Sequence, residues 1–216
     1  MKAFIIAMAL AAGLMAGPAG AGPLSDLIMA PGVLAQAPAG PVFHYAHSRH
    51  LPGHPAGTAP PQPAGGMAPP KPVVDGTLTL TAGPGDHGPQ LVLTRTEAGE
   101  THPVATFPAA GPNPVLLFFL ENTVRVMATE TGGSPFYIRN RIRAALADAG
   151  AGATEGEVLL HPFETDPNRA RMGDFATLAL HLAFDPARPG RLVELKADTA
   201  AGPAGYTETL ALQAEE

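Results

Sequence analysis

The chain has no cysteine among its 216 residues. This absence excludes structural disulfides, a lipid-modified cysteine and a thiol nucleophile. It does not argue against export, because a domain of this size can bury enough apolar surface to fold without disulfides. A chain that is exported and contains no cysteine fits a bacterial periplasm best.

Long apolar runs are also scarce, and the one that stands out lies at the N-terminus. Lys2 precedes an apolar stretch from Ala3 to Ala16, which is shorter than the roughly 20 residues needed to span a bilayer. Pro18 ends the stretch, and Ala19-Gly20-Ala21 matches a signal-peptidase site. We therefore expect a signal peptide over residues 1–21 and a periplasmic or secreted protein, with an uncleaved anchor as the alternative. Nothing later in the chain predicts a membrane span.

Positively charged residues are fewer than negatively charged ones, with 13 Lys and Arg against 19 Asp and Glu. The formal net charge is −6, and from residue 73 onward ten Lys and Arg face eighteen Asp and Glu. An acidic domain repels phosphate backbones, so the composition argues against nucleic-acid binding.

Proline and glycine, by contrast, are abundant, with 25 residues of each. Many of them lie before Lys71, and stretches such as "PAGTAPPQPAGG" are too poor in large apolar residues to build a core. This distribution predicts a disordered linker over residues 22–72, rich in Pro, Gly and His, followed by a single domain over residues 73–216.

The order of periodic segments within this domain predicts an α+β fold. Asn113-Pro114 and Ser134-Pro135 are typical helix starts, and Gly132-Gly133 separates the two helices they begin. Strand-like alternation flanks this helical hairpin on both sides. The expected strands occupy residues 76–82, 89–99, 157–163, 174–185, 191–198 and 206–213, with a further short one at 102–107. We therefore expect an antiparallel sheet of about six strands, with the hairpin inserted after the first strands and packed on one face.

Four of the eight histidines lie in "FHYAHSRHLPGH", at His44, His47, His50 and His54. Neutral imidazole is a good ligand for Zn²⁺ and Cu²⁺, so the tract is a candidate metal site for buffering or delivering metal. The spacing matches no closed zinc pattern. The alternative is a solvated leader that is histidine-rich by chance.

Arginines gather at the start of the second helix, in "SPFYIRNRIR". Arg139 and Arg143 are four residues apart, so they lie on one flank of the helix, where a pair of guanidinium groups can bind a carboxylate or phosphate. Phe136 and Tyr137, at the start of this helix, are candidates for lining a small pocket between the hairpin and the sheet; the alternative is that they pack the helix start against the core. The alternative is that the arginines pair with the protein's own acidic residues.

The sequence favours a non-catalytic binding or assembly module that acts through the helical hairpin, with another envelope protein as a possible partner. Metal buffering through the histidine tract is the runner-up. A hydrolase using Arg139, His161 and Asp174 is a third hypothesis, which lacks a convincing nucleophile. The sequence contains no phosphate loop, dinucleotide fingerprint or zincin motif. It predicts no cofactor and leaves the oligomeric state open.

Overall fold

The computed structural model describes residues 31–53, 70–149 and 156–213. It shows an α+β domain with an eight-stranded antiparallel sheet and two helices inserted after the fourth strand. The helices and strands are β1 (Gly40–His50), β2 (Val73–Gly83), β3 (Gln90–Glu97), β4 (Glu100–Pro108), α1 (Pro114–Thr131), α2 (Pro135–Ala149), β5 (Glu157–Leu160), β6 (Ala179–Phe184), β7 (Leu192–Asp198) and β8 (Thr207–Leu212).

The sheet consists of two meanders joined at its centre. Its strand order is β4-β3-β2-β1-β8-β7-β6-β5, so β1 pairs with β8, the last strand of the chain. The first half of β1 pairs only with β2, and Tyr45 to His50 pair with β8 as well. Pairing of β1 with β8 therefore holds the two halves of the sheet together.

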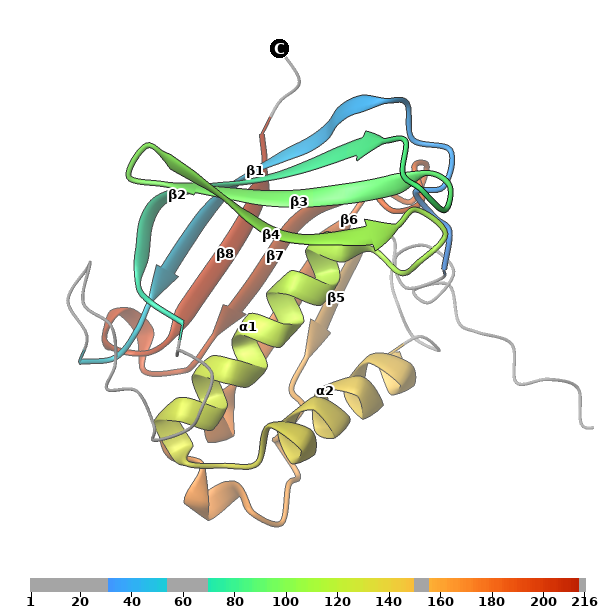
Figure 1. The fold of residues 1–216 in the computed structure, drawn as a ribbon. Helices are drawn as coiled ribbons and strands as arrows, with labels where there is room; N and C mark the ends of the chain where they lie inside the picture. The colour runs from blue at the N-terminus through green and yellow to red at the C-terminus, as the bar shows by residue number, and fades with distance from the viewer. Residues whose placement is uncertain (1–30, 54–69, 150–155, 214–216) are drawn as a thin grey trace, which may run out of the picture.

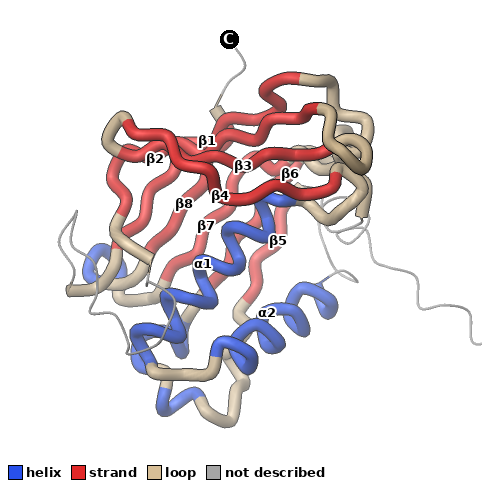
Figure 2. The backbone as a smooth tube through the Cα atoms, viewed as in Figure 1, coloured by secondary structure: helices blue, strands red, loops and turns tan. Residues whose placement is uncertain are grey.

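The sheet is strongly twisted, as expected for an open sheet of this width. The β1–β4 half turns over α1, and the β5–β8 half lies behind it, so α1 runs through the hollow of the sheet (Figure 1). The second helix lies beside α1 and towards β5 (Figure 2). The opposite face of the sheet carries no helix among the described residues.

The start of α1 is fixed by its cap. The Asn113 side chain accepts hydrogen bonds from the backbone N–H groups of Val115 and Leu116, and its amide donates to the Gly190 carbonyl at 2.8 Å. Gly132 ends the helix in the left-handed conformation, with φ at 65°. The caps predicted from the sequence thus give α1 both its length and its position over the sheet.

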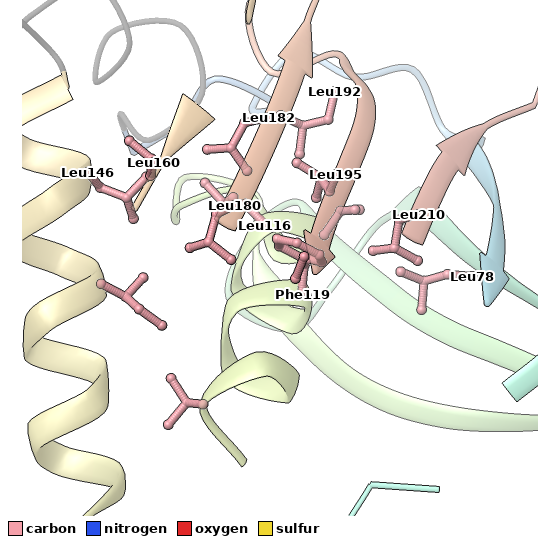
Figure 3. Close-up of a cluster of buried hydrophobic side chains, with 14 of the residues drawn as sticks. Leu78, Leu116, Phe119, Leu146, Leu160, Leu180, Leu182, Leu192, Leu195 and Leu210 are labelled. Carbon is pink, nitrogen blue, oxygen red and sulfur yellow. The ribbon is translucent and has the colours of Figure 1, made fainter. Parts of the chain in front are cut away.

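The core fills the space between the sheet and the helices. Leucines dominate it, and they come from inward positions of alternating strands and from both helices. Figure 3 shows part of this cluster, in which Leu116 and Phe119 of α1 meet Leu195 of β7 and Leu180 of β6. On α2, Ile138, Ile142 and Leu146 are buried, as their spacing predicts.

The structure confirms the α+β class, the antiparallel sheet and the inserted helical hairpin. The sheet has eight strands where about six were expected. The linker prediction for residues 22–72 is wrong in part, because residues 40–50 form β1 at the centre of the sheet. Residues 174–177 belong to a 3-10 helix (Gly173–Thr177) that precedes β6, and they were wrongly predicted as strand. The signal-peptide prediction lies outside the described residues.

Candidate functional site: an apolar groove above a buried ionic network

An open groove of about 480 Å³ runs between α1, α2 and the β3–β4 hairpin. Its apolar lining comes from all of these elements, and its few polar groups sit on the two helices. The lining residues are Leu93, Val104, Phe107, Leu117, Phe118, Leu120, Glu121, Asn122, Val124, Arg125, Arg139, Ile142, Arg143 and Leu146.

The floor of the groove is the side of α1 that faces α2 and the β3–β4 hairpin. Leu117, Leu120 and Val124 follow one another at helical spacing along this side. Leu117 remains 39% exposed and Leu120 is half-buried, whereas Val124 is buried. The adjoining side of α1 is also apolar and packs in the core, with Leu116 and Phe119 buried. The apolar surface of α1 is therefore wider than the part that the core covers, and Leu117 is left partly exposed in the groove.

The wall formed by β4 is an edge strand with an irregular register. The pairing of β3 with β4 shifts between Leu93 and Thr94, where Val104 is the extra residue on β4. A bulge bends an edge strand and turns its side chains. Val104 lines the groove and is 37% exposed.

The rim of the groove is positive, although the chain as a whole is acidic. Its charged residues are Arg125, Arg139 and Arg143 with only Glu121 opposing them. Burial lowers the pKa of Arg125 from its ordinary value, Glu121 acts to raise it, and the charges of Arg49 and Arg95 lower it further. The lowered pKa of Arg125 thus comes mainly from its burial.

The two arginines singled out in the sequence differ in their contacts. Arg139 forms a forked ion pair with Glu121, in which Nε donates at 3.2 Å and Nη2 at 2.9 Å to the same carboxylate oxygen. This contact joins α2 to α1. Arg143 lies one turn further along α2, is exposed, and makes no hydrogen bond or ion pair with any residue that the structure describes.

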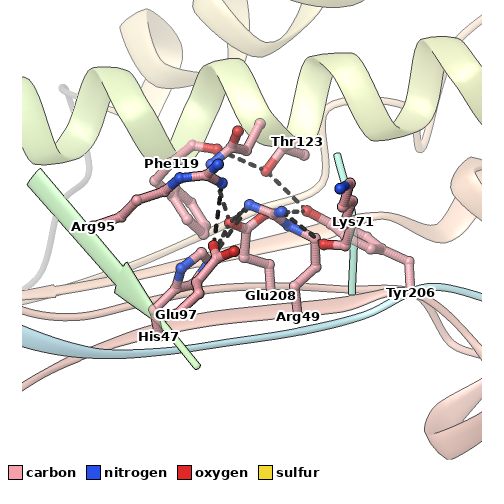
Figure 4. Close-up of polar contacts among 10 residues, drawn as sticks. His47, Arg49, Lys71, Arg95, Glu97, Phe119, Thr123, Tyr206 and Glu208 are labelled. Carbon is pink, nitrogen blue, oxygen red and sulfur yellow. Dashed lines mark hydrogen bonds and ion pairs between the residues drawn. The ribbon is translucent and has the colours of Figure 1, made fainter. Parts of the chain in front are cut away.

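Beneath the groove lies a fully buried ionic network centred on Glu208 of β8 (Figure 4). One carboxylate oxygen accepts from Arg49 at 2.6 Å and from His47 at 3.0 Å, and from the Asn122 amide at 3.3 Å. The other accepts from the Tyr206 hydroxyl at 2.9 Å. Such a network is stable only when the buried charges are paired, as Glu208 and Arg49 are here. Two of its buried nitrogens, His47 Nδ1 and Arg49 Nε, have no hydrogen-bond partner among the described residues.

The pKa of Glu208 falls from its ordinary value of 4.5 to about 2. Burial alone would raise this pKa, but the charge of Arg49 and the hydrogen bonds from His47 and Arg49 outweigh burial. The carboxylate is thus ionised at every physiological pH. Burial and the nearby Glu208 charge raise the pKa of Tyr206, so its hydroxyl stays protonated and donates.

Two residues of α1 belong to both the groove and the network. Asn122 lines the groove and donates to Glu208, and Phe118 lines the groove and meets the His47 ring edge-to-face, with ring centroids 5.7 Å apart. The network therefore fixes the rotation of α1, and this rotation directs the side that carries Leu117 into the groove.

Tyr137, the third predicted binding residue, lines a second pocket of about 330 Å³ at the junction of α1 and α2, away from the groove, and its hydroxyl contacts the protein itself. Its hydroxyl donates to the carboxylate of Asp166 at 2.8 Å and accepts from the Asn168 amide at 3.0 Å. Arg141 forms an ion pair with the same carboxylate at 2.8 Å. These contacts hold α2 to the segment before β6, on the far side of α2 from Arg143.

The histidine tract is divided by strand alternation. His47 faces the core, while His44 and His50 lie exposed on the outer face of β1. Six residues of strand separate His44 from His50, about 20 Å, so these two cannot share one ion. The structure shows no cluster of three or more metal-ligand side chains within the described residues, and His54 falls outside them.

The residues of the hydrolase hypothesis also lie apart. His161 and Asp174 are exposed, and no side-chain contact joins His161 to another titratable group in the described part of the chain. Arg139 is engaged by Glu121 on the other helix. This arrangement offers the hydrolase hypothesis no geometric support.

Comparisons with protein-family models, with curated proteins and with solved structures found no match to this chain. Function therefore has to be argued from the site. Within the described residues, neither helix is long and apolar enough to cross a membrane.

Proposed function

We propose that this chain is an exported, non-catalytic binding module whose groove between α1, α2 and the β3–β4 hairpin holds an elongated apolar molecule. The observation that carries this proposal is the apolar lining of the groove, in which Leu117 of α1 and Val104 of β4 are left 39% and 37% exposed. The export part of the proposal rests on the expected signal peptide.

The size and composition of the groove support a small-molecule ligand. A volume of about 480 Å³ lies within the range of about 300–1,000 Å³ typical of ligand pockets, which are mostly apolar with a few polar groups. Ligand binding would remove the partly exposed Leu117 and Val104 from water, at roughly 25 cal/mol per Å² of apolar surface. The lining as described contains no serine, threonine, cysteine or histidine, which fits binding better than catalysis.

The groove is also well supported from below. The buried ion pair and hydrogen bonds of Glu208 hold β1, β8 and α1 together. Binding sites need such rigid support to keep their walls in place. In this proposal the network has a structural role, and the groove has the binding role.

The test uses the neutral, polarity-sensitive dye Nile red with the full-length chain and the variant Leu117→Glu. Leu117 is 39% exposed, so the variant is expected to fold. A carboxylate on the groove floor should weaken dye binding at least tenfold, because a buried charge without adequate pairing is costly. Far-UV circular dichroism and the urea midpoint check folding.

The matched control is Leu159→Glu, the same substitution at a leucine that is 59% exposed on β5 and outside the groove. It should leave dye binding unchanged. Equal dye binding by the wild type and folded Leu117→Glu would overturn the proposal, as would an equal loss in both variants.

A further inference from the structure

The groove has a chemical asymmetry beyond its apolar floor. In a chain of net charge −6, its rim carries three arginines and one glutamate. An apolar molecule without charge would not need this rim, whereas a molecule with a negative end would be attracted to it.

The contacts of the arginines define where this end lies. The Glu121 carboxylate accepts hydrogen bonds from Arg139 Nη2 at 2.9 Å and from Arg139 Nε at 3.2 Å, so Arg139 is already paired with a carboxylate. Arg143 sits on the same flank of α2, four residues on, and forms no hydrogen bond or ion pair with any described residue. Its guanidinium group has the geometry to take a second carboxylate as Arg139 takes the first.

We infer that the ligand is a single-chain amphiphile with a carboxylate end, whose apolar tail lies along Leu117 and Leu120 and whose carboxylate pairs with Arg143. This inference rests on the proposed function, because it adds a head group to the ligand that the groove holds. One unpaired arginine suits a monoanion better than a doubly charged phosphate.

Glu121 has a defined role in this arrangement. Its carboxylate competes for the same arginines and repels a second carboxylate nearby. Glu121 therefore sets the affinity of the site, and removing its charge should strengthen anion binding.

The experiment compares three compounds with ten-carbon chains that differ only in their end group: decanoate, decan-1-ol and decylammonium. Each is titrated against Nile red bound to the full-length chain. Decanoate should displace the dye at least tenfold more effectively than decan-1-ol, and decylammonium should be the weakest. Three variants follow, namely Arg143→Gln, Glu121→Gln and, as control, Arg171→Gln, an exposed arginine outside the groove.

Arg143→Gln should reduce decanoate binding about tenfold and leave decan-1-ol unchanged. Glu121→Gln should raise decanoate affinity severalfold, an effect that a purely structural role would not produce. Arg171→Gln should change neither. The Glu121–Arg139 pair is half-exposed, so its loss should not unfold the chain.

The outcomes separate this inference from the proposed function. If all three compounds displace the dye equally, the inference of a carboxylate end is overturned, while the proposal that the groove binds an apolar molecule is unaffected. If none displaces it and the dye binding is unaffected by Leu117→Glu, the groove itself is wrong. Dye binding that weakens as protein concentration rises, together with a doubled mass, would place a second copy in the groove and would also overturn the inference.

Discussion

The substitution Glu208→Gln tests whether the buried network supports the fold. Glutamine keeps the shape of the side chain but removes the charge that balances Arg49, whose contact at 2.6 Å is buried on both sides. It also places an amide N–H group among donors from His47, Arg49, Asn122 and Tyr206. Removing one partner of a buried ion pair typically costs about 3–5 kcal/mol.

The pKa of Glu208 gives an independent estimate of how much its ionised form contributes to the free energy of unfolding. A fall from 4.5 to about 2, at about 1.4 kcal/mol per pH unit, corresponds to about 3 kcal/mol of stability. Because the folded-state pKa is depressed, this contribution is fully present above pH 4.5 and is lost as pH falls towards 2. By pH 3 about half of it should be gone.

The assay is urea unfolding followed by far-UV circular dichroism at pH 7 and at pH 3. With a slope of about 2 kcal/mol per molar urea, a loss of about 3 kcal/mol lowers the midpoint by about 1.5 M at pH 7. At pH 3 the gap between wild type and Glu208→Gln should narrow to about half. The control Glu194→Gln changes a carboxylate on the neighbouring β7 that is not fully buried, and it should move the midpoint little.

A Glu208→Gln variant within 0.5 kcal/mol of wild type at pH 7 would refute this reasoning, as would a gap of the same size at both pH values. The first result would show that the buried charge of Glu208 does not depend on Arg49 for its stability. The second would show that its contribution does not depend on its ionisation.

Two further predictions concern the Tyr137 hydroxyl and the strand β1. Tyr137→Phe removes the hydroxyl that donates to buried Asp166. The free energy of unfolding in urea should fall by about 1.5–3 kcal/mol, with Nile red binding unchanged. Loss of dye binding without loss of stability would show instead that Tyr137 contacts the ligand. A chain that starts at Val73 lacks β1, removes His47 and Arg49 from Glu208 and splits the sheet between β2 and β8. It should therefore lack a cooperative thermal transition, and a folded product with wild-type circular dichroism would contradict the central position of β1.

The helical hairpin and most strands were predictable because their signals are local. Asn113-Pro114 fixes the start of α1 through one cap, and the alternation of Leu and Thr in β2 gives its buried and exposed faces. These features depend on neighbours within a few residues, so they follow from propensity and period alone.

The strand β1 was missed because its buried face is polar. Tyr45, His47 and Arg49 point inward, and the apolar alternation that marks a half-buried strand is therefore absent. The compensating charge is Glu208, 159 residues from Arg49. One signal was nevertheless present, since Glu208 falls on the same face of its strand as Tyr206 and Leu210, and a carboxylate on an apolar face requires a buried cation.

The groove was only partly predictable. The excess of apolar residues around α1 is visible in the sequence, but the sequence does not show that Leu117 is left 39% exposed while Leu116 is buried. Which side of α1 meets the sheet depends on Asn122 reaching Glu208 and on Phe118 meeting His47, and both contacts are long-range. The sequence placed Arg139 and Arg143 on one flank of the helix, but it did not show that Glu121 engages only the first of them.

The most direct test of the groove is methyl NMR of the full-length chain, labelled at leucine and valine and titrated with decanoate. The account predicts that chemical-shift changes concentrate at Leu93, Val104, Leu117 and Val124, which line the groove, while the exposed Leu159 and Val193 stay unmoved. Changes centred on Leu159 or Val193, or no changes at millimolar decanoate, would contradict it.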